Sequence, residues 1–261
     1  MQNNLTKKEI DNLYNWAKKY NIKELQTKNR KKLLNIKELY ISLNNLNELP
    51  KEIGNLINIE KLMIGNYIYE CKINKLPKEI CNLTKLKKLE ISCDKLKELP
   101  KEIYNLTNLE EFLINCDNLE ELPKEIENLT ELKSLQIKCD KLVKLPKEIG
   151  SFAKLEYIFI CCKNLKVLPK EIGNLRKVKD FTLFQSNLTK LPKEIINLVN
   201  LERLEICHGY NLKEFPKEVI NLVKLKDLKI SQCGKIKNLP KEICNLTKLK
   251  RFKIESLSLK A

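Results

Sequence analysis

Cysteine and histidine are the residues of this chain whose chemistry could support metal binding or redox activity. Four cysteines recur at 23-residue intervals: Cys93, Cys116, Cys139 and Cys162. If their segments stack as parallel strands, neighbouring cysteines lie about 4.8 Å apart, within the range that a disulfide tolerates. A redox or metal ladder is therefore one hypothesis. The favoured interpretation is a small, partly buried residue at a fixed repeat position, because the chain has 1 histidine and no Cys-x-x-Cys pair.

Catalytic signatures are missing from the sequence. It has no glycine-rich phosphate-binding loop and no nucleophile elbow, and His208 has no second histidine for a proton relay. Cys161, Cys207 and His208 fall near one another in the repeat pattern, but Phe184 is expected to lie between their strands. We therefore predict a protein that is not an enzyme, with no cofactor and no metal site.

The cysteines belong to a repeat that organises the whole chain. All 9 prolines sit in variants of the phrase Leu-Pro-Lys-Glu-Ile, from Pro50 to Pro240, at intervals of 27, 23, 23, 23, 23, 23, 24 and 24 residues. A second phrase, apolar-x-x-apolar-x-apolar, occurs ten times, as in Leu86, Leu89 and Ile91. Its last two apolar positions alternate with polar ones, which is typical of a strand with one buried face.

Each unit is predicted to be a short strand, a turn and a helical segment that returns to the next strand. Proline suits the first position of the helical segment, where its missing N–H is harmless, and asparagines such as Asn82, Asn105 and Asn128 are expected to end it in a left-handed conformation. No unit can bury its leucines alone, so the units must stack. Ten parallel strands then line the concave face of a curved α/β solenoid.

The pattern from Leu86 to Leu106, Leu-x-x-Leu-x-Ile-x-x-Asp-x-Leu-x-x-Leu-Pro-x-x-Ile-x-x-Leu, resembles the leucine-rich-repeat family. It is most similar to the intracellular 23-residue type, over residues 33–256. The resemblance implies protein–protein recognition on the concave face, without a shared catalytic residue. The family's usual asparagine after the strand is replaced here, as the chain has Asp94, Asp117 and Lys163 at that position.

The two ends of the chain depart from the repeat. Residues 5–20 read as an amphipathic helix with a Thr6/Glu9 capping box, so residues 1–32 are predicted to form an N-terminal helical cap and residues 33–261 one continuous solenoid. Trp16 is expected to cover the first unit, with a partner contact as the alternative. Four extra residues after the second strand place Tyr67 and Tyr69 in an insertion, which predicts either a binding contact or a local flap. The C-terminal segment resembles an open edge, which predicts a monomer or a weak end-to-end dimer.

Composition limits the remaining choices. The formal charge is +16, which would suit a polyanion or an acidic surface, but the predicted concave positions are nearly neutral and no aromatic residues interleave the basic runs. Nucleic acid is therefore not a favoured partner. The start of the chain carries no apolar run typical of a signal peptide, and no stretch of 18 apolar residues occurs, so we predict reduced cysteines, no membrane span and a cytoplasmic location.

The predicted concave face carries one group of aromatic residues. The candidate protein-binding residues are Tyr157, Phe159, Phe184, Arg203, Glu205, His208 and Leu113. Aromatic residues with arginine on a rigid surface are typical of binding hot spots. The leading hypothesis is a non-catalytic scaffold that binds a protein partner there. The alternatives are polyanion binding through the basic cap and exterior, and self-assembly through the C-terminal edge.

Overall fold

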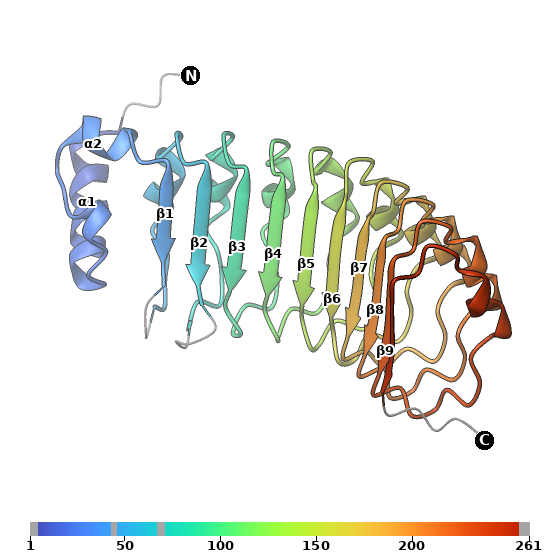
Figure 1. The fold of residues 1–261 in the computed structure, drawn as a ribbon. Helices are drawn as coiled ribbons and strands as arrows, with labels where there is room; N and C mark the ends of the chain where they lie inside the picture. Colours follow the sequence, from blue (N-terminus) through green and yellow to red (C-terminus); the bar gives the residue numbers. More distant parts are fainter. Residues whose placement is uncertain (1–4, 43–45, 67–70, 256–261) are drawn as a thin grey trace.

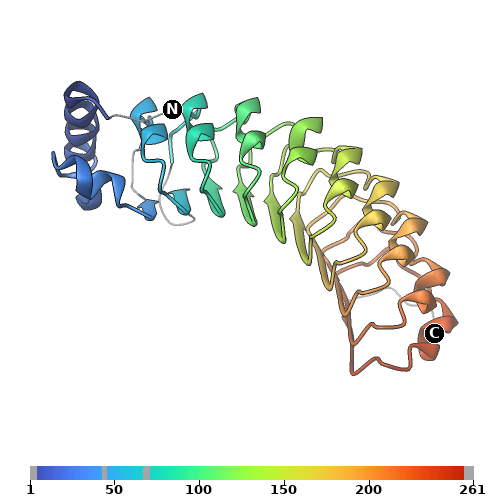
Figure 2. The same cartoon turned by 90° about the horizontal axis from the view of Figure 1, so that it is seen from above.

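Ten strands form one parallel sheet, and strands that follow one another in the chain are neighbours in the sheet. The computed structural model describes residues 5–42, 46–66 and 71–255 (Figure 1). Seen along the strands, the solenoid is an arc with the sheet on its inner side and short helical turns on its outer side (Figure 2). The strands are β1 (Glu38–Ile41), β2 (Lys61–Gly65), β3 (Lys88–Ser92), β4 (Glu111–Asn115), β5 (Ser134–Lys138), β6 (Tyr157–Cys161), β7 (Asp180–Phe184), β8 (Arg203–Cys207), β9 (Asp227–Ser231) and β10 (Arg251–Glu255).

The strands form because their side chains alternate between core and solvent. In β3, Leu89 and Ile91 are fully buried, and they align with Phe112 and Ile114 of β4. The same register repeats from strand to strand, so equivalent apolar residues stack in continuous rows. The predicted architecture, a ten-stranded solenoid with an N-terminal helix, is confirmed.

The helical segments on the outer side are 3-10 turns. They are η2 (Lys51–Asn55), η3 (Lys78–Asn82), η4 (Lys101–Asn105), η5 (Lys124–Asn128), η6 (Lys147–Ser151), η7 (Lys170–Asn174), η8 (Lys193–Asn197), η9 (Lys217–Asn221) and η10 (Lys241–Asn245). The proline lies one residue before each turn, as its N-cap, and not at the first helical position as expected; Pro77, for example, has φ −67° and ψ 135°.

The expected left-handed asparagine at the end of each turn is wrong. Leu83, which follows Asn82, has φ −76° and ψ 58°, and the Thr84 N–H donates to the Asn82 carbonyl at 2.8 Å. These are the angles and the hydrogen bond of an inverse γ-turn. This ending keeps Leu83 in the core, where it is fully buried.

The residue after each strand carries a second correction, because the eighth position of the unit was expected to face the concave side. Cys116 is fully buried, and its thiol donates to the Ile91 carbonyl of the preceding unit at 3.8 Å. The chain turns back into the core immediately after β3 to β6, so a cysteine occupies the place usual for asparagine. Neither Asp117 nor Lys163 takes that role.

Units seven to nine make this turn differently. Their eighth residues, Gln185, His208 and Gln232, have left-handed φ angles of 47°, 57° and 53°. The ninth residue then enters the core: Cys233 is fully buried, and its thiol donates to the Ile206 carbonyl at 3.8 Å. The added residue accounts for the 24-residue intervals of units eight and nine.

The N-terminal end of the sheet is covered by helices α1 (Lys7–Lys19) and α2 (Arg30–Leu34) and the short turn η1 (Lys23–Leu25) (Figure 1). Thr6 and Glu9 form the predicted capping box. Trp16 is 7% exposed, and its indole N–H donates to the Glu48 carbonyl at 3.1 Å. Trp16 therefore covers the first unit and is not available as a partner anchor.

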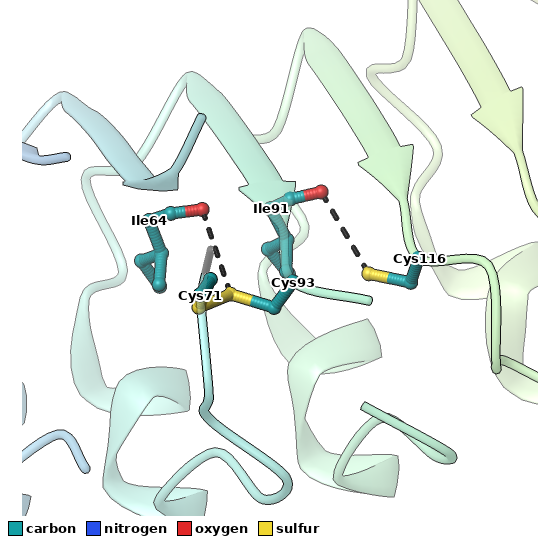
Figure 3. The surroundings of a disulfide bond; sticks show 5 residues. All are labelled: Ile64, Cys71, Ile91, Cys93 and Cys116. Atoms are coloured by element: carbon teal, nitrogen blue, oxygen red, sulfur yellow. Dashed lines mark hydrogen bonds between the residues drawn. A yellow bond between two sulfur atoms is a disulfide. The ribbon is translucent and has the colours of Figure 1, made fainter. Parts of the chain in front are cut away.

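A disulfide joins Cys71 to Cys93 across a sequence separation of 22 residues (Figure 3). The other 8 cysteines are free, in line with the expectation of reduced thiols, which fails only at this pair. The Cys93 sulfur also lies 3.9 Å from the Ile64 carbonyl, the contact that the free thiol of Cys116 makes with Ile91. Both redox forms of Cys93 therefore fit the same place in the core.

A ladder of alternating charge runs along one side of the solenoid at the second position of each unit. Starting at the first unit, its members are Lys37, Glu60, Lys87, Glu110, Lys133, Glu156, Lys179, Glu202, Lys226 and Lys250. Ion pairs join neighbours, such as Lys133 to Glu110 at 2.6 Å and Lys179 to Glu156 at 2.7 Å. Alternation ends at Lys250, where lysine follows lysine. This ladder neutralises many of the charges on its side of the molecule.

Candidate protein-binding surface

The concave face is made by the third, fifth and seventh residues of each unit, whose side chains point away from the core. On β6 these positions hold Tyr157, Phe159 and Cys161, and β7 places Asp180, Thr182 and Phe184 directly beside them. Alternation along a strand is the reason that every second residue reaches this face. The sheet therefore fixes the spacing of the predicted contact residues.

Five aromatic side chains gather on this face over β6 to β8, and we call them the aromatic patch. Tyr157 and Phe159 come from β6, Phe184 from β7, and His208 and Tyr210 from the loop after β8. Tyr157, Phe159, Phe184 and His208 are half-buried, and Tyr210 is 55% exposed. The patch combines a supported base with accessible ring surface.

His208 connects the strand residues of the aromatic patch to the loop. Its left-handed backbone turns the ring toward Phe184, with ring centroids 4.7 Å apart in an edge-on arrangement. Tyr210 packs on the other side at 5.7 Å. Sequence reasoning missed Tyr210; the signal that could have found it is the extra residue of this unit, with Gly209 directly after His208.

Charged residues border the aromatic patch. The Arg203 guanidinium lies 3.5 Å from Asp180 and 4.0 Å from Glu205. Burial raises the pKa of Asp180 above its ordinary value, and Arg203 opposes this shift only in part. Burial likewise raises the pKa of the Tyr157 hydroxyl. Arg203 is exposed and thus remains accessible for contacts beyond Asp180 and Glu205.

The cysteines of this region are poorly suited to chemistry at neutral pH. Cys161 and Cys207 flank Phe184 in the register, as expected, and each is 3% exposed. Burial raises the pKa of Cys161 to about 11 and that of Cys162 to about 12. These thiols are therefore protonated and unreactive. Within the described residues, no group of three His, Cys, Asp or Glu side chains is arranged to hold a metal ion.

Two of the predicted contacts stand apart from the aromatic patch or outside the description. Leu113 lies on β4, next to Gln136 of β5, which in turn lies next to Phe159. It therefore extends the central row of the concave face but does not touch the patch. Tyr67 and Tyr69 of the insertion lie outside the described residues.

The C-terminal strand leaves inward-facing positions accessible. β10 pairs with β9, and Phe252, whose equivalents are buried in the other strands, is 45% exposed. Among the residues that the structure describes, no helix has both the length and the hydrophobicity that a membrane span requires.

Comparison with known proteins gives the class of this fold. The sequence matches the family described as "Leucine-rich repeat region" over residues 15–148 and 144–260. The chain therefore belongs to the leucine-rich-repeat family. Its assignment to the intracellular 23-residue subtype stays a prediction. No curated protein matches the sequence significantly.

Solved structures with a similar fold come from bacteria and plants. An internalin, InlF of Listeria monocytogenes, shares 18% identity with a TM-score of 0.61, over 88% of this chain and 70% of that one. Internalin C2 of the same species shares 15% identity with a TM-score of 0.58, over 92% of each chain. The plant peptide hormone receptor RGFR1, solved in complex with RGF2, shares 25% identity with a TM-score of 0.56, over 86% of this chain and 44% of the receptor.

Proposed function

We propose that this chain is a non-catalytic scaffold that binds a protein partner on its concave face through the aromatic patch. The observation that carries the proposal is the packing of Phe184, His208 and Tyr210 into one accessible cluster beside Arg203. Aromatic and arginine side chains dominate the energetics of protein interfaces. Leucine-rich-repeat domains typically act as protein-interaction scaffolds, and the similar plant receptor is seen in complex with RGF2.

Rigidity is the physical reason that such a face would bind well. The ring-bearing residues Tyr157, Phe159 and Phe184 stand on strands whose backbone is fixed by neighbours on both sides. Little conformational entropy would be lost on docking, since aromatic side chains have few rotatable bonds and these are already packed. The apolar ring surface would supply affinity, and Arg203 and Glu205 would supply orientation.

The test is affinity capture from a nuclease-treated lysate of the native cell, washed at low and at high salt. We expect one discrete protein to be retained at high salt, and the double variant Phe159→Ala, Phe184→Ala to lose it while keeping its circular dichroism spectrum. The variant Tyr40→Ala, which removes an exposed aromatic residue of β1, is the matched control and should retain the partner. Unchanged retention by the double variant would refute the site.

The same experiment separates the alternatives. Retention that disappears with salt or nuclease would favour polyanion binding through the basic cap and exterior. Oligomers that grow with concentration in sedimentation, and disappear in Phe252→Lys, would favour self-assembly through β10. The proposed location is the cytoplasm; a persistent disulfide is more typical of oxidising compartments, so the redox state of Cys71 in cells tests that part of the proposal.

A further inference from the structure

A shallow hollow of about 250 Å³ lies on the concave face near its N-terminal end, away from the aromatic patch. Its walls are Tyr40 of β1, Lys61 and Met63 of β2, and Lys88 and Glu90 of β3, with Glu111 of β4 at the rim. Most residues at equivalent positions of the sheet are open to solvent or half-buried. Glu90 is the exception, because it is only 9% exposed.

The surroundings of Glu90 leave its carboxylate uncompensated. Its neighbours in the register are the apolar residues Met63 and Leu113. Within the described part of the chain, the carboxylate accepts no hydrogen bond and forms no ion pair. Burial raises the pKa of Glu90 above its ordinary value, and Lys88 opposes this only in part. At the same position of β8, Glu205 has Arg203 at 4.0 Å.

Two more polar atoms beside Glu90 are buried without a partner. Ser92 follows Glu90 on the same face of β3 and is 3% exposed, and Asn115 lies opposite Ser92 on β4 and is 5% exposed. The Ser92 hydroxyl oxygen and the Asn115 amide oxygen both lack a hydrogen-bond partner. Unpaired buried polar atoms are rare in folded proteins and costly. Here three of them, on two adjacent strands, can all accept a hydrogen bond.

The lysines at the rim do not compensate Glu90, because each is engaged elsewhere. Lys61 pairs with Glu38 at 2.8 Å, and Lys88 pairs with Glu111 at 2.8 Å. These two pairs are neutral, so the ionised Glu90 gives the hollow a net negative charge. A cation that carries several hydrogen-bond donors is the chemical complement of this arrangement.

We infer that the hollow is a binding site for the guanidinium group of an arginine side chain presented by the protein partner. A guanidinium is planar and always charged, and its five N–H donors can serve the Glu90 carboxylate and neighbouring acceptors together. The identity of the arginine's owner rests on the proposed function; the chemistry of the hollow does not. β3 and β7 are four strands apart, so the arginine would lie roughly 20 Å from the side chain that meets Phe184.

The direct test uses N-acetyl-arginine amide as the probe and the full chain at pH 7, followed by carboxyl-carbon NMR of labelled glutamate. We expect saturable shifts at the Glu90 carboxyl and none with N-acetyl-citrulline amide, which has nearly the same shape without the charge. Glu90→Gln should lower the affinity by roughly tenfold or more. Glu255→Gln, which removes one charge from β10 of the same face, is the matched control and should bind as the unaltered chain does.

A second variant guards against loss of the fold. Asn115→Asp keeps the size of the side chain and adds an acceptor with negative charge, so it should bind the arginine amide more tightly. Equal binding by Glu90→Gln, equal binding of the citrulline amide, equal losses in Glu90→Gln and Glu255→Gln, or no saturable shift would each overturn the inference. So would an Asn115→Asp chain that folds and gains no affinity.

The test is separable from that of the proposed function. The double variant Phe159→Ala, Phe184→Ala should bind the arginine amide normally, because the hollow is built from β1 to β4. Loss of the protein partner with retained arginine binding would refute the aromatic patch alone. Retained partner binding with no arginine binding would refute the hollow alone.

Discussion

The imidazole Nδ1 of His208 lies 2.7 Å from the hydroxyl of Tyr210, so the two side chains form a hydrogen-bonded pair at the end of β8. The pair exists because His208 adopts a left-handed φ of 57°, which directs its ring toward the concave face and not into the core. Gly209, the next residue, is buried in its place. A backbone conformation that is unfavourable for most residues therefore builds one side of the aromatic patch.

The backbone of His208 gives the first prediction. His208→Asn and His208→Val both remove the ring, but asparagine tolerates the left-handed region and β-branched valine does not. We expect His208→Val to be less stable than His208→Asn by about 1–2 kcal/mol. Urea denaturation of the two variants measures the difference. Equal stabilities would mean that the turn adopts another conformation in solution.

The disulfide gives the second prediction. Cys71→Ser opens a covalent loop with a sequence separation of 22 residues, which should lower the free energy of unfolding by about 3 kcal/mol relative to the oxidised chain. Cys244→Ser is the control, because Cys244 is exposed and free, and it should change little. If a reducing agent lowers the stability of Cys71→Ser as much as that of the unaltered chain, another disulfide is responsible.

The close packing of the outer turns gives the third prediction. A Cβ added at Gly173 would lie 2.3 Å from the Glu194 carbonyl oxygen of the next unit, a contact that only a backbone shift can relieve. Gly173→Ala should therefore destabilise the fold by about 1–3 kcal/mol. Glu127 occupies the same place in η5 and is exposed, so Glu127→Ala should be nearly neutral in the same thermal unfolding experiment. Similar effects of both changes would argue against tight packing of η7 on η8.

The charge ladder gives the fourth prediction. Hydrogen bonds from Lys133, Lys179 and Lys226 lower the pKa values of Glu110, Glu156 and Glu202 below the ordinary value of 4.5. These carboxylates bind protons more readily in the unfolded chain than in the folded one. Their contribution to stability is thus present above pH 4.5 and is lost as the pH falls further.

Chemical denaturation at pH 7 and at about pH 3 tests the ladder. Stability should fall between the two, and high salt at pH 7 should reduce it modestly, because the pairs are exposed and therefore screened. A midpoint that stays constant from neutral to acidic pH would show that the ladder contributes nothing measurable.

The repeat made most of the fold predictable. Leu89 and Ile91 recur in register with their equivalents, and no other arrangement buries so many leucines at such spacing. What sequence reasoning could not supply were local backbone choices. Cys116 and Gln185 hold the same numbered position in their units, yet one enters the core and the other takes a left-handed conformation. That difference depends on one added residue and on how each turn meets its neighbour.

The candidate site was predictable to the same depth. The grouping of Tyr157, Phe159 and Phe184 follows from strand register alone. Tyr210 was missed because its place depends on the left-handed turn at His208. Glu90 was missed because its burial depends on side chains from three neighbouring strands, and no single-residue pattern records that.

Alternation along the charge ladder has a consequence for how this chain can be lengthened or shortened. Deleting a single internal unit would bring two lysines or two glutamates side by side, whereas deleting two consecutive units, such as those of Glu156 and Lys179, would restore a lysine beside a glutamate. The smallest interchangeable module is therefore a pair of units, although the strand and its turn repeat singly. A designed extension of the solenoid should accordingly be tolerated better when its units are inserted in even numbers.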